Sequence, residues 1–288
     1  MKKLNLLLIL VLLTSLSRGQ KISNTIQLSS NWEYTHFAYC QTDEKALAES
    51  ESAHWKMAVV PGDVHLDLQR DGVLPNLVFG QNFYRSVWVE NEDFMYRTSF
   101  NAPSFKKNSR MYLDFDGLDC FATIWLNGKQ IGKTHNMFMR YSFDVSDLLK
   151  AKDNRLLIRL ASPMKEIYNY YPNAEEVLKK INGAFGVKER LITRKAQMSY
   201  GWDNTPRIIT TGIFRPVKLR ICETARIDNV WFRTKLENNY QTATANIVVE
   251  TLLNGNKDAE VEVVLTKGNK KYSEQDITQK MWCLPGNN

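Results

Sequence analysis

The chain has 288 residues, of which 43% are hydrophobic, 11% aromatic and 24% charged, and its formal net charge is +7. These values are ordinary for a globular protein and exclude a disordered chain, a collagen and a coiled coil. At about 100–200 residues per domain, the length fits one large domain or up to two smaller ones, and a whole barrel enzyme with accessory domains does not fit.

The first 19 residues have the pattern of a secretory signal peptide. A basic start is followed by the apolar run Leu4–Leu13 and by small residues, with cleavage expected near Gly19 or at Ser17. The run is too short to span a bilayer, which needs about 20 residues. Loss of the three basic residues in this segment lowers the net charge from +7 to +4, too little to indicate nucleic-acid binding. We therefore expect a secreted or periplasmic protein without a membrane span.

From residue 21 onward, short segments of alternating apolar residues are separated by turn formers. Asn127-Gly128 predicts a tight hairpin, because both central positions of a type I′ turn need positive φ. Spacings of about 8–12 residues favour an all-β sandwich over an alternating βαβ fold. The predicted strands are Phe94–Phe100, Arg110–Phe115, Ala122–Leu126, Arg155–Ala161, Val217–Cys222 and Ile227–Lys235. The last of these begins beyond residue 225.

Two short helices are predicted as insertions in this β pattern. The first is Val64–Arg70, and the second is Asn173–Ile181, where Asn173 and Glu176 give a start similar to a capping box. The second helix follows a cluster of tyrosines, and long insertions of this kind often carry binding function. An ordered surface excursion is the alternative interpretation. The tyrosines are Tyr168, Tyr170 and Tyr171.

The pattern changes near residue 225. A new strand begins there, and the alternating runs Thr242–Leu252 and Ala259–Leu265 flank the turn signal Asn254-Gly255. An immunoglobulin-like sandwich needs about 100 residues, but residues 226–288 are too few, and residues 281–288 break the alternation. We predict an incomplete immunoglobulin-like sandwich, as from a truncation or a frameshift. The alternative is a small tail of three or four strands that pairs with the first domain.

The sequence predicts no metal site and no cofactor. The four histidines show no ligand spacing, and the sequence contains no Gly-rich phosphate loop, no HExxH string and no Ser/His/Asp order. The cysteines are widely and irregularly spaced, and Cys120 and Cys222 are predicted to be buried free thiols; the other two are Cys40 and Cys283. Asp116, Asp119 and Asp144 stand at strand ends, where we expect them to pin turns or loops.

Several strings, none decisive alone, occur in an order and spacing that resembles a known family. They are Val60–His65, Trp88–Arg97, Phe115–Asp119, Ala122–Gly128, Asn136–Phe138, Tyr141–Val145, Arg194–Gln197, Gly201–Asp203 and Gly212–Val217. Across residues 25–225 this pattern resembles the N-terminal sugar-binding domain of glycoside hydrolase family 2, most closely its β-mannosidase branch. The resemblance implies a galactose-binding-like jelly-roll β-sandwich over residues 21–225, followed by the start of the family's immunoglobulin-like domain.

The resemblance also implies retaining, exo-acting hydrolysis of terminal β-D-mannosides in the full-length family. That chemistry needs two carboxyl groups about 5–5.5 Å apart. In the family both belong to a (β/α)₈ barrel that follows the two sandwiches, and a barrel takes about 250 residues. We therefore expect no catalytic residue in this chain, and a missing catalytic barrel as its partner in the full-length form.

In β-mannosidases a Trp-Asp pair from the first domain contacts the terminal mannose, and Trp202 and Asp203 match it. An indole stacks on a pyranose face, and a carboxylate accepts hydrogen bonds from two adjacent hydroxyls. The family usually continues with Trp-Gly before a proline, where this chain has Asn204-Thr205. The resemblance therefore does not specify the rim of the pocket or the sugar that it accepts. In the alternative, Trp202 packs on the sandwich and Asp203 pairs with Arg207 or Arg194.

Three functions compete. The first is the non-catalytic N-terminal portion of a β-mannosidase-like glycosidase that acts on a terminal β-mannoside or a related sugar. The second is a stand-alone carbohydrate-binding module. The third is an adhesion or scaffold sandwich, which no feature of the sequence supports. Asp63 and Asn136 are secondary candidates for sugar contacts.

Overall fold

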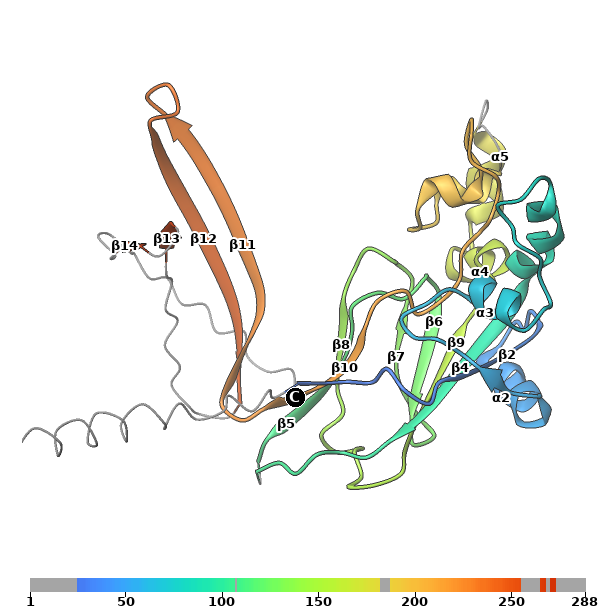
Figure 1. Ribbon diagram of the computed structural model, residues 1–288, viewed down its shortest axis with the longest axis horizontal. Helices are drawn as coiled ribbons and strands as arrows, with labels where there is room; N and C mark the ends of the chain where they lie inside the picture. The colour runs from blue at the N-terminus through green and yellow to red at the C-terminus, as the bar shows by residue number, and fades with distance from the viewer. Residues whose placement is uncertain (1–24, 107, 182–186, 255–264, 268–269, 273–288) are drawn as a thin grey trace, which may run out of the picture.

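The computed structural model describes residues 25–106, 108–181, 187–254, 265–267 and 270–272. Ten strands form two antiparallel sheets (Figure 1). The four-stranded sheet has the order β1 (Thr25–Gln27), β10 (Val217–Cys222), β5 (Arg110–Phe115), β8 (Tyr141–Asp144). The six-stranded sheet has the order β3 (Lys56–Met57), β2 (Glu33–Ala38), β4 (Glu92–Phe100), β9 (Asn154–Leu160), β6 (Ala122–Leu126), β7 (Lys129–Thr134).

The two sheets share one hydrophobic core. Phe94 and Ile158 of the six-stranded sheet are buried in the same cluster as Leu113 and Leu219 of the four-stranded sheet. Burial of each such side chain stabilises the fold by about 1.5–3 kcal/mol relative to its exposure. The predicted all-β sandwich is confirmed, because alternating residues of both sheets meet in this core.

The predicted hairpin between β6 and β7 is also confirmed. Asn127 and Gly128 have φ values of 53° and 84°, the positive values that a two-residue turn of this kind requires. The Asn127 amide nitrogen donates to the Leu148 carbonyl at 2.8 Å, and its oxygen accepts from the Arg155 amide at 2.9 Å. The turn residue therefore also fixes the neighbouring loop and the start of β9.

Helices gather mainly at one end of the sandwich (Figure 1). The predicted helix α3 (Val64–Arg70) is confirmed, and Asp63 caps it. Helix α5 (Ala174–Lys180) forms as predicted, but the Asn173 side chain makes no capping hydrogen bond, so the expected capping box is wrong. Beside these helices lie α4 (Pro163–Tyr170) and the 3₁₀ segments η1 (Asn82–Asn91), η2 (Lys188–Leu191) and η3 (Gln197–Tyr200), while α2 (Asp43–Ser52) lies beside β2.

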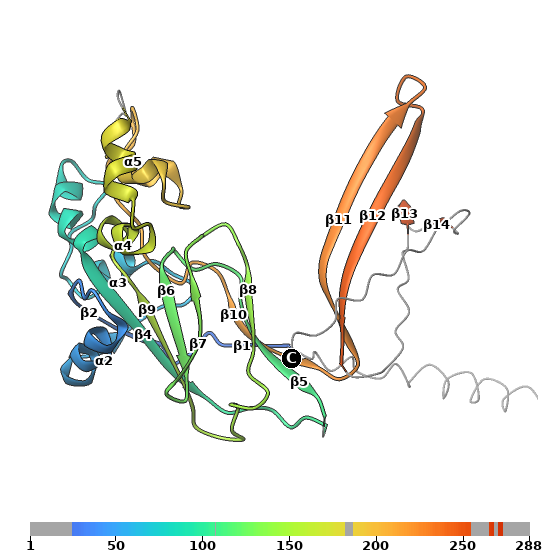
Figure 2. The ribbon, with the colours of Figure 1, turned by 180° about the vertical axis from the view of Figure 1, so that it is seen from behind.

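After residue 224 a long hairpin of β11 (Ala225–Glu237) and β12 (Thr242–Leu253) extends away from the sandwich (Figure 1, Figure 2). Its base is held by Arg226, which donates to the Ser142 hydroxyl at 2.9 Å, and by Asn254, which donates to the Asn108 carbonyl at 2.6 Å. A second, short hairpin joins β13 (Leu265–Lys267) and β14 (Lys270–Tyr272). The immunoglobulin-like assignment and the boundary at 225 stay predictions.

Several sequence predictions concern parts of the chain outside the described residues. These are the signal peptide at 1–19, most of the run at 259–265, residues 281–288 and Cys283. Cys120 and Cys222 are buried, as predicted; Cys120 is a free thiol, and so is the buried Cys40. None of the helices that the structure describes has the length and apolarity to cross a membrane.

Candidate functional site

The Trp202–Asp203 pair lies on a two-residue turn that follows η3. Trp202 and Thr205 exchange both backbone hydrogen bonds at 3.1 Å, which leaves Asp203 and Asn204 at the tip. Gly201 ends η3 with φ 96°, a backbone conformation that other residues rarely adopt. The glycine thus sets the direction in which the turn leaves η3.

Both predicted site residues are exposed on this turn. The Trp202 side chain is 53% exposed, and the Arg190 guanidinium lies 5.6 Å from the centre of the indole ring. The Asp203 carboxylate forms no hydrogen bond or ion pair with any residue in the described parts of the chain. The alternative in which Asp203 pairs with Arg207 is therefore wrong, and no described contact joins Asp203 to Arg194.

Arg207 instead braces the turn against the end of η1. Its guanidinium Nε donates to Glu90 Oε2 at 2.9 Å, and Nη2 donates to Glu90 Oε1, so the pair is bidentate. Burial raises the pKa of the Glu90 carboxyl, and Arg207 counteracts this rise. The two parallel hydrogen bonds fix the chain directly after the turn.

A second buried ion pair braces the segment before the turn. Lys195, whose side chain is fully buried, donates to Asp119 Oδ2, to the Thr210 carbonyl at 2.6 Å and to the Thr210 hydroxyl at 2.9 Å. Asp119 is buried and joins the sandwich to residues 195 and 210, so it pins these loop segments, as predicted. Loss of one partner of such a buried pair costs about 3–5 kcal/mol.

The side chains of the two secondary candidates for sugar contacts accept hydrogen bonds from nearby backbone amides. Asp63 accepts hydrogen bonds from the His65 amide at 2.8 Å and from the Thr211 amide at 2.9 Å. The Asn136 side-chain oxygen accepts from the Phe138 amide at 2.9 Å. Both residues therefore shape loops near the site, and neither offers a free polar group comparable to the Asp203 carboxylate.

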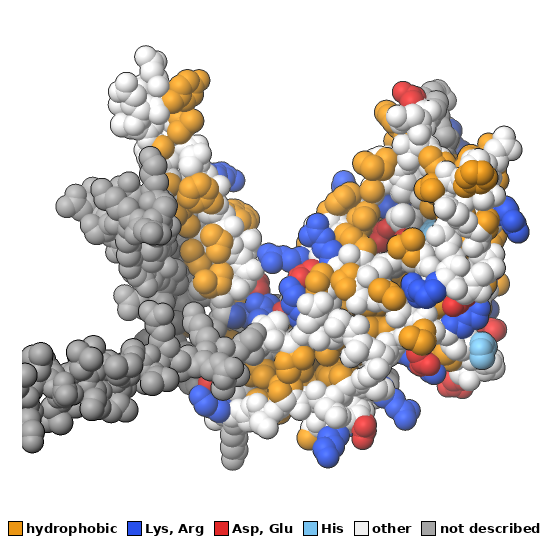
Figure 3. Space-filling view, viewed as in Figure 1, with side chains coloured by type: hydrophobic (Ala, Val, Ile, Leu, Met, Phe, Trp, Pro, Cys, Tyr) orange, Lys and Arg blue, Asp and Glu red, His pale blue; other side chains and the backbone are white. Residues whose placement is uncertain are grey.

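Exposed apolar side chains lie on the segment that leads into the turn and on a loop that is hydrogen-bonded to this segment. Figure 3 shows hydrophobic groups spread over the helical end of the sandwich. The loop between β7 and β8 joins this surface, since the Met137 amide donates to the Arg194 carbonyl at 3.0 Å. The exposed apolar residues of these two segments are Phe138, Met139, Leu191 and Met198. Such a surface is typical of an interaction site.

The described residues contain no cluster of three or more His, Cys, Asp or Glu side chains that would hold a metal ion. What the turn offers chemically is an exposed indole beside an uncommitted carboxylate. An indole supplies an apolar, polarisable face, and a carboxylate accepts two hydrogen bonds at fixed geometry. This arrangement suits recognition of a ring that carries hydroxyl groups.

Comparisons with known proteins identify the family of this domain. Residues 26–215 match the family described as glycosyl hydrolase 2 galactose-binding domain-like. Beta-mannosidase B of Thermothelomyces thermophilus is 34% identical over 225 residues, covering 77% of this chain and 24% of that protein. Beta-mannosidase B of Aspergillus clavatus is 36% identical over 219 residues, covering 73% of this chain and 25% of that protein.

A solved structure shows the same relation. The beta-D-mannosidase of Dictyoglomus thermophilum superposes with a TM-score of 0.64 at 37% identity, covering 80% of this chain and 26% of that one. The chain spans about a quarter of the length of the curated relatives that it matches. Through residues 26–215 the chain belongs to glycoside hydrolase family 2, as a galactose-binding-like N-terminal domain whose relatives are β-mannosidases.

Proposed function

We propose that this chain is the N-terminal, non-catalytic portion of a retaining, exo-acting β-mannosidase-like glycosidase. In this function Trp202 and Asp203 contact the terminal sugar, while the two catalytic carboxyl groups belong to a barrel outside the chain. The observation that carries the proposal is the exposed Trp202–Asp203 turn on a family 2 N-terminal domain, with the Asp203 carboxylate uncommitted among the described residues.

The bracing of the turn supports this role. A sugar-contacting group must be held near its productive position before the substrate arrives. Lys195 fixes the segment before the turn, and Arg207 fixes the segment after it. The tip itself carries exposed side chains, so the rigid frame presents Trp202 and Asp203 outward.

The apolar surface beside the turn supports the second part of the proposal. Exposed Met198 lies just before the turn, and exposed Phe138 lies on the loop that is hydrogen-bonded to Arg194; we expect both to face a partner domain. The substrate contacts would then be completed by that partner, and it would supply the acid/base and the nucleophile. The signal-like start of the sequence leads us to propose secretion or periplasmic export.

A chimeric enzyme tests the proposal. Residues 25–225 of this chain replace the corresponding segment of the Dictyoglomus thermophilum β-D-mannosidase, which is 37% identical. We expect the folded chimera to hydrolyse aryl β-D-mannosides. A folded chimera that is inactive on every aryl β-glycoside would refute the role, and one that acts on a different glycoside would refute the mannoside assignment.

The alternative is a stand-alone carbohydrate-binding module, which the 53% exposure of Trp202 favours. A module of this kind binds sugar without a barrel. Titration of the 288-residue chain with manno-oligosaccharides distinguishes the two functions. A binding component that is lost in Trp202→Ala supports the module, and absence of any Trp202-dependent binding at millimolar sugar contradicts it.

A further inference from the structure

A groove runs along the open edge of β2. None of the residues that line it belongs to the Trp202 turn. Strand β3 pairs with β2 only at Glu33 and Tyr34. Beyond Tyr34 the chain of residues 52–54 diverges from β2 and leaves the edge at Thr35–Phe37 uncovered. The resulting cavity has a volume of about 330 Å³, at the small end of the 300–1,000 Å³ that is typical of ligand sites.

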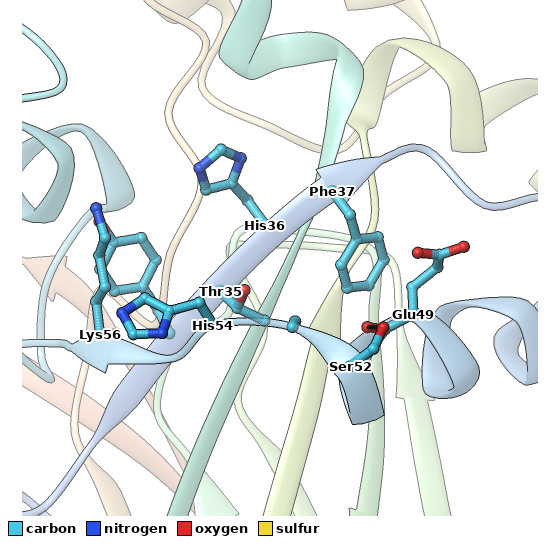
Figure 4. A pocket seen from close by; sticks show the side chains of 9 residues that line it. Thr35, His36, Phe37, Glu49, Ser52, His54 and Lys56 are labelled. Atoms are coloured by element: carbon cyan, nitrogen blue, oxygen red, sulfur yellow. Dashed lines mark hydrogen bonds between the residues drawn. The ribbon is translucent and has the colours of Figure 1, made fainter.

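The groove has two chemically different sides (Figure 4). Phe37, Glu49 and Ser52 lie at one end, where an aromatic ring stands beside a carboxylate and a hydroxyl. His54 and Lys56 lie at the other end and supply hydrogen-bond donors. An occupant of the groove therefore meets an apolar face, acceptors and donors within one small volume.

The ring of His36 does not belong to this lining. Its Nδ1 lies 2.5 Å from Glu92 Oε2. Its ring stacks on Phe94 with a centroid distance of 5.5 Å and contacts Trp88 in a tilted arrangement at 5.2 Å. Figure 4 shows the imidazole on the side of β2 opposite Phe37. Thr35 and Phe37 thus face the groove, while His36 contributes its backbone.

The polar groups of the lining are largely uncommitted. In the described parts of the chain, the carboxylate of Glu49 and the ring of His54 form no hydrogen bond or ion pair. Lys56 Nζ lies 3.5 Å from Asp71 Oδ2, a loose pair that leaves donors available. The charges of Glu49 and Lys56 offset each other, so the lining favours neither an anion nor a cation.

We propose that this groove binds one neutral sugar residue, as a second carbohydrate site that does not involve Trp202. The ring face of Phe37 suits the C–H face of a pyranose, and Glu49 suits two adjacent hydroxyls. A bound peptide strand is the competing occupant of an open sheet edge. The uncovered edge is short and is bounded by β3 and by α2, so it offers few main-chain hydrogen bonds to a strand.

Nuclear magnetic resonance on the ¹⁵N-labelled 288-residue chain tests this proposal, with β-1,4-mannobiose and cellobiose as the probes. We expect saturable shifts of the amides of Thr35–Phe37 and His54. The variants Glu49→Gln and Phe37→Leu should each weaken this binding, Glu49→Gln by about tenfold because a charge-assisted pair of hydrogen bonds is lost. The matched control Glu51→Gln, also on α2 but outside the groove, should bind like the parent.

The outcomes separate this site from the proposed function. Shifts at β2 that persist in Trp202→Ala support the groove whatever the turn does. Shifts confined to residues 200–207 overturn the groove and leave the proposed function standing. No shift with either sugar overturns the groove, as does a shift at β2 with an extended test peptide but not with sugar. Unchanged amide dispersion in each variant shows that it is folded.

Discussion

Gly201 is the residue on which the orientation of the turn depends most. At φ 96° a side chain is strained, although the space there is not closed, since a Cβ would lie 3.6 Å from the Arg207 Cβ. We predict that Gly201→Ala lowers the free energy of unfolding by about 1–2 kcal/mol and shifts the amide signals of Trp202 and Asp203. Urea unfolding and amide spectra measure both effects.

The matched control is Gly132→Ala, which clashes with Phe143 in the sandwich and should leave the turn signals in place. An unchanged turn in Gly201→Ala would contradict the account.

At the scale of elements, a charged cluster joins α2 to the six-stranded sheet. Arg159 of β9 donates to Asp43 of α2 at 2.8 Å and to Asp93 of β4 at 3.0 Å, and Lys133 of β7 lies 2.7 Å from Asp43. Burial raises the pKa of the Asp43 carboxyl, but Lys133 and Arg159 outweigh it and lower the pKa below its ordinary 3.8. A lowered folded pKa gives stability that is present above 3.8 and is lost as the pH falls through the folded value.

We therefore predict that acid destabilises the parent chain more than Asp43→Asn. Urea unfolding at about pH 6 and about pH 3 measures the difference. The parent should lose part of its advantage over the variant between these values. An advantage that stays constant or grows in acid would show that Asp43 is not held ionised by Lys133 and Arg159.

At the scale of the whole molecule, the β11–β12 hairpin exposes large apolar side chains (Figure 3). Val230, Phe232 and Leu236 share a face of β11 because side chains alternate, and all three are more than half exposed. Two-stranded hairpins are marginally stable alone, and exposed apolar strands promote association.

We predict that Phe232→Thr with Leu236→Thr reduces light scattering of the concentrated chain and leaves the melting temperature of the sandwich unchanged. Arg233→Thr, on the opposite face, is the control and should not reduce scattering.

The sequence predicts those parts of the fold that depend on local pattern. Period-2 alternation locates β5, β6 and β10 at their observed bounds, and Asn127-Gly128 identifies the hairpin. The helices α2 and α4 are missed, although Thr42 and the pair Ser162-Pro163 stand at their starts as capping signals. Each capping signal is short and stands within a long β-rich pattern, so the pattern alone predicts no helix at these positions.

The bracing of the site could not be predicted from the sequence. Lys195 and Asp119 are 76 residues apart, and Arg207 and Glu90 are 117 apart. No local periodicity links residues at such separations, and only the folded topology brings them together. The prediction of Trp202 and Asp203 rests on the family resemblance, because a Trp-Asp pair has no distinctive pattern of its own. Its exposure and its bracing are what the structure adds.

The most direct test of the central claim is the kcat/KM for an aryl β-D-mannoside in the chimeric enzyme that carries residues 25–225. We predict that Asp203→Asn lowers kcat/KM by about 10–100-fold, because a charge-assisted hydrogen bond to the sugar is lost, and that Trp202→Ala lowers it as well. Glu175→Gln, on the exposed surface of α5, should leave it unchanged. An Asp203→Asn chimera with the full activity of its parent would contradict the claim that this turn contacts the substrate.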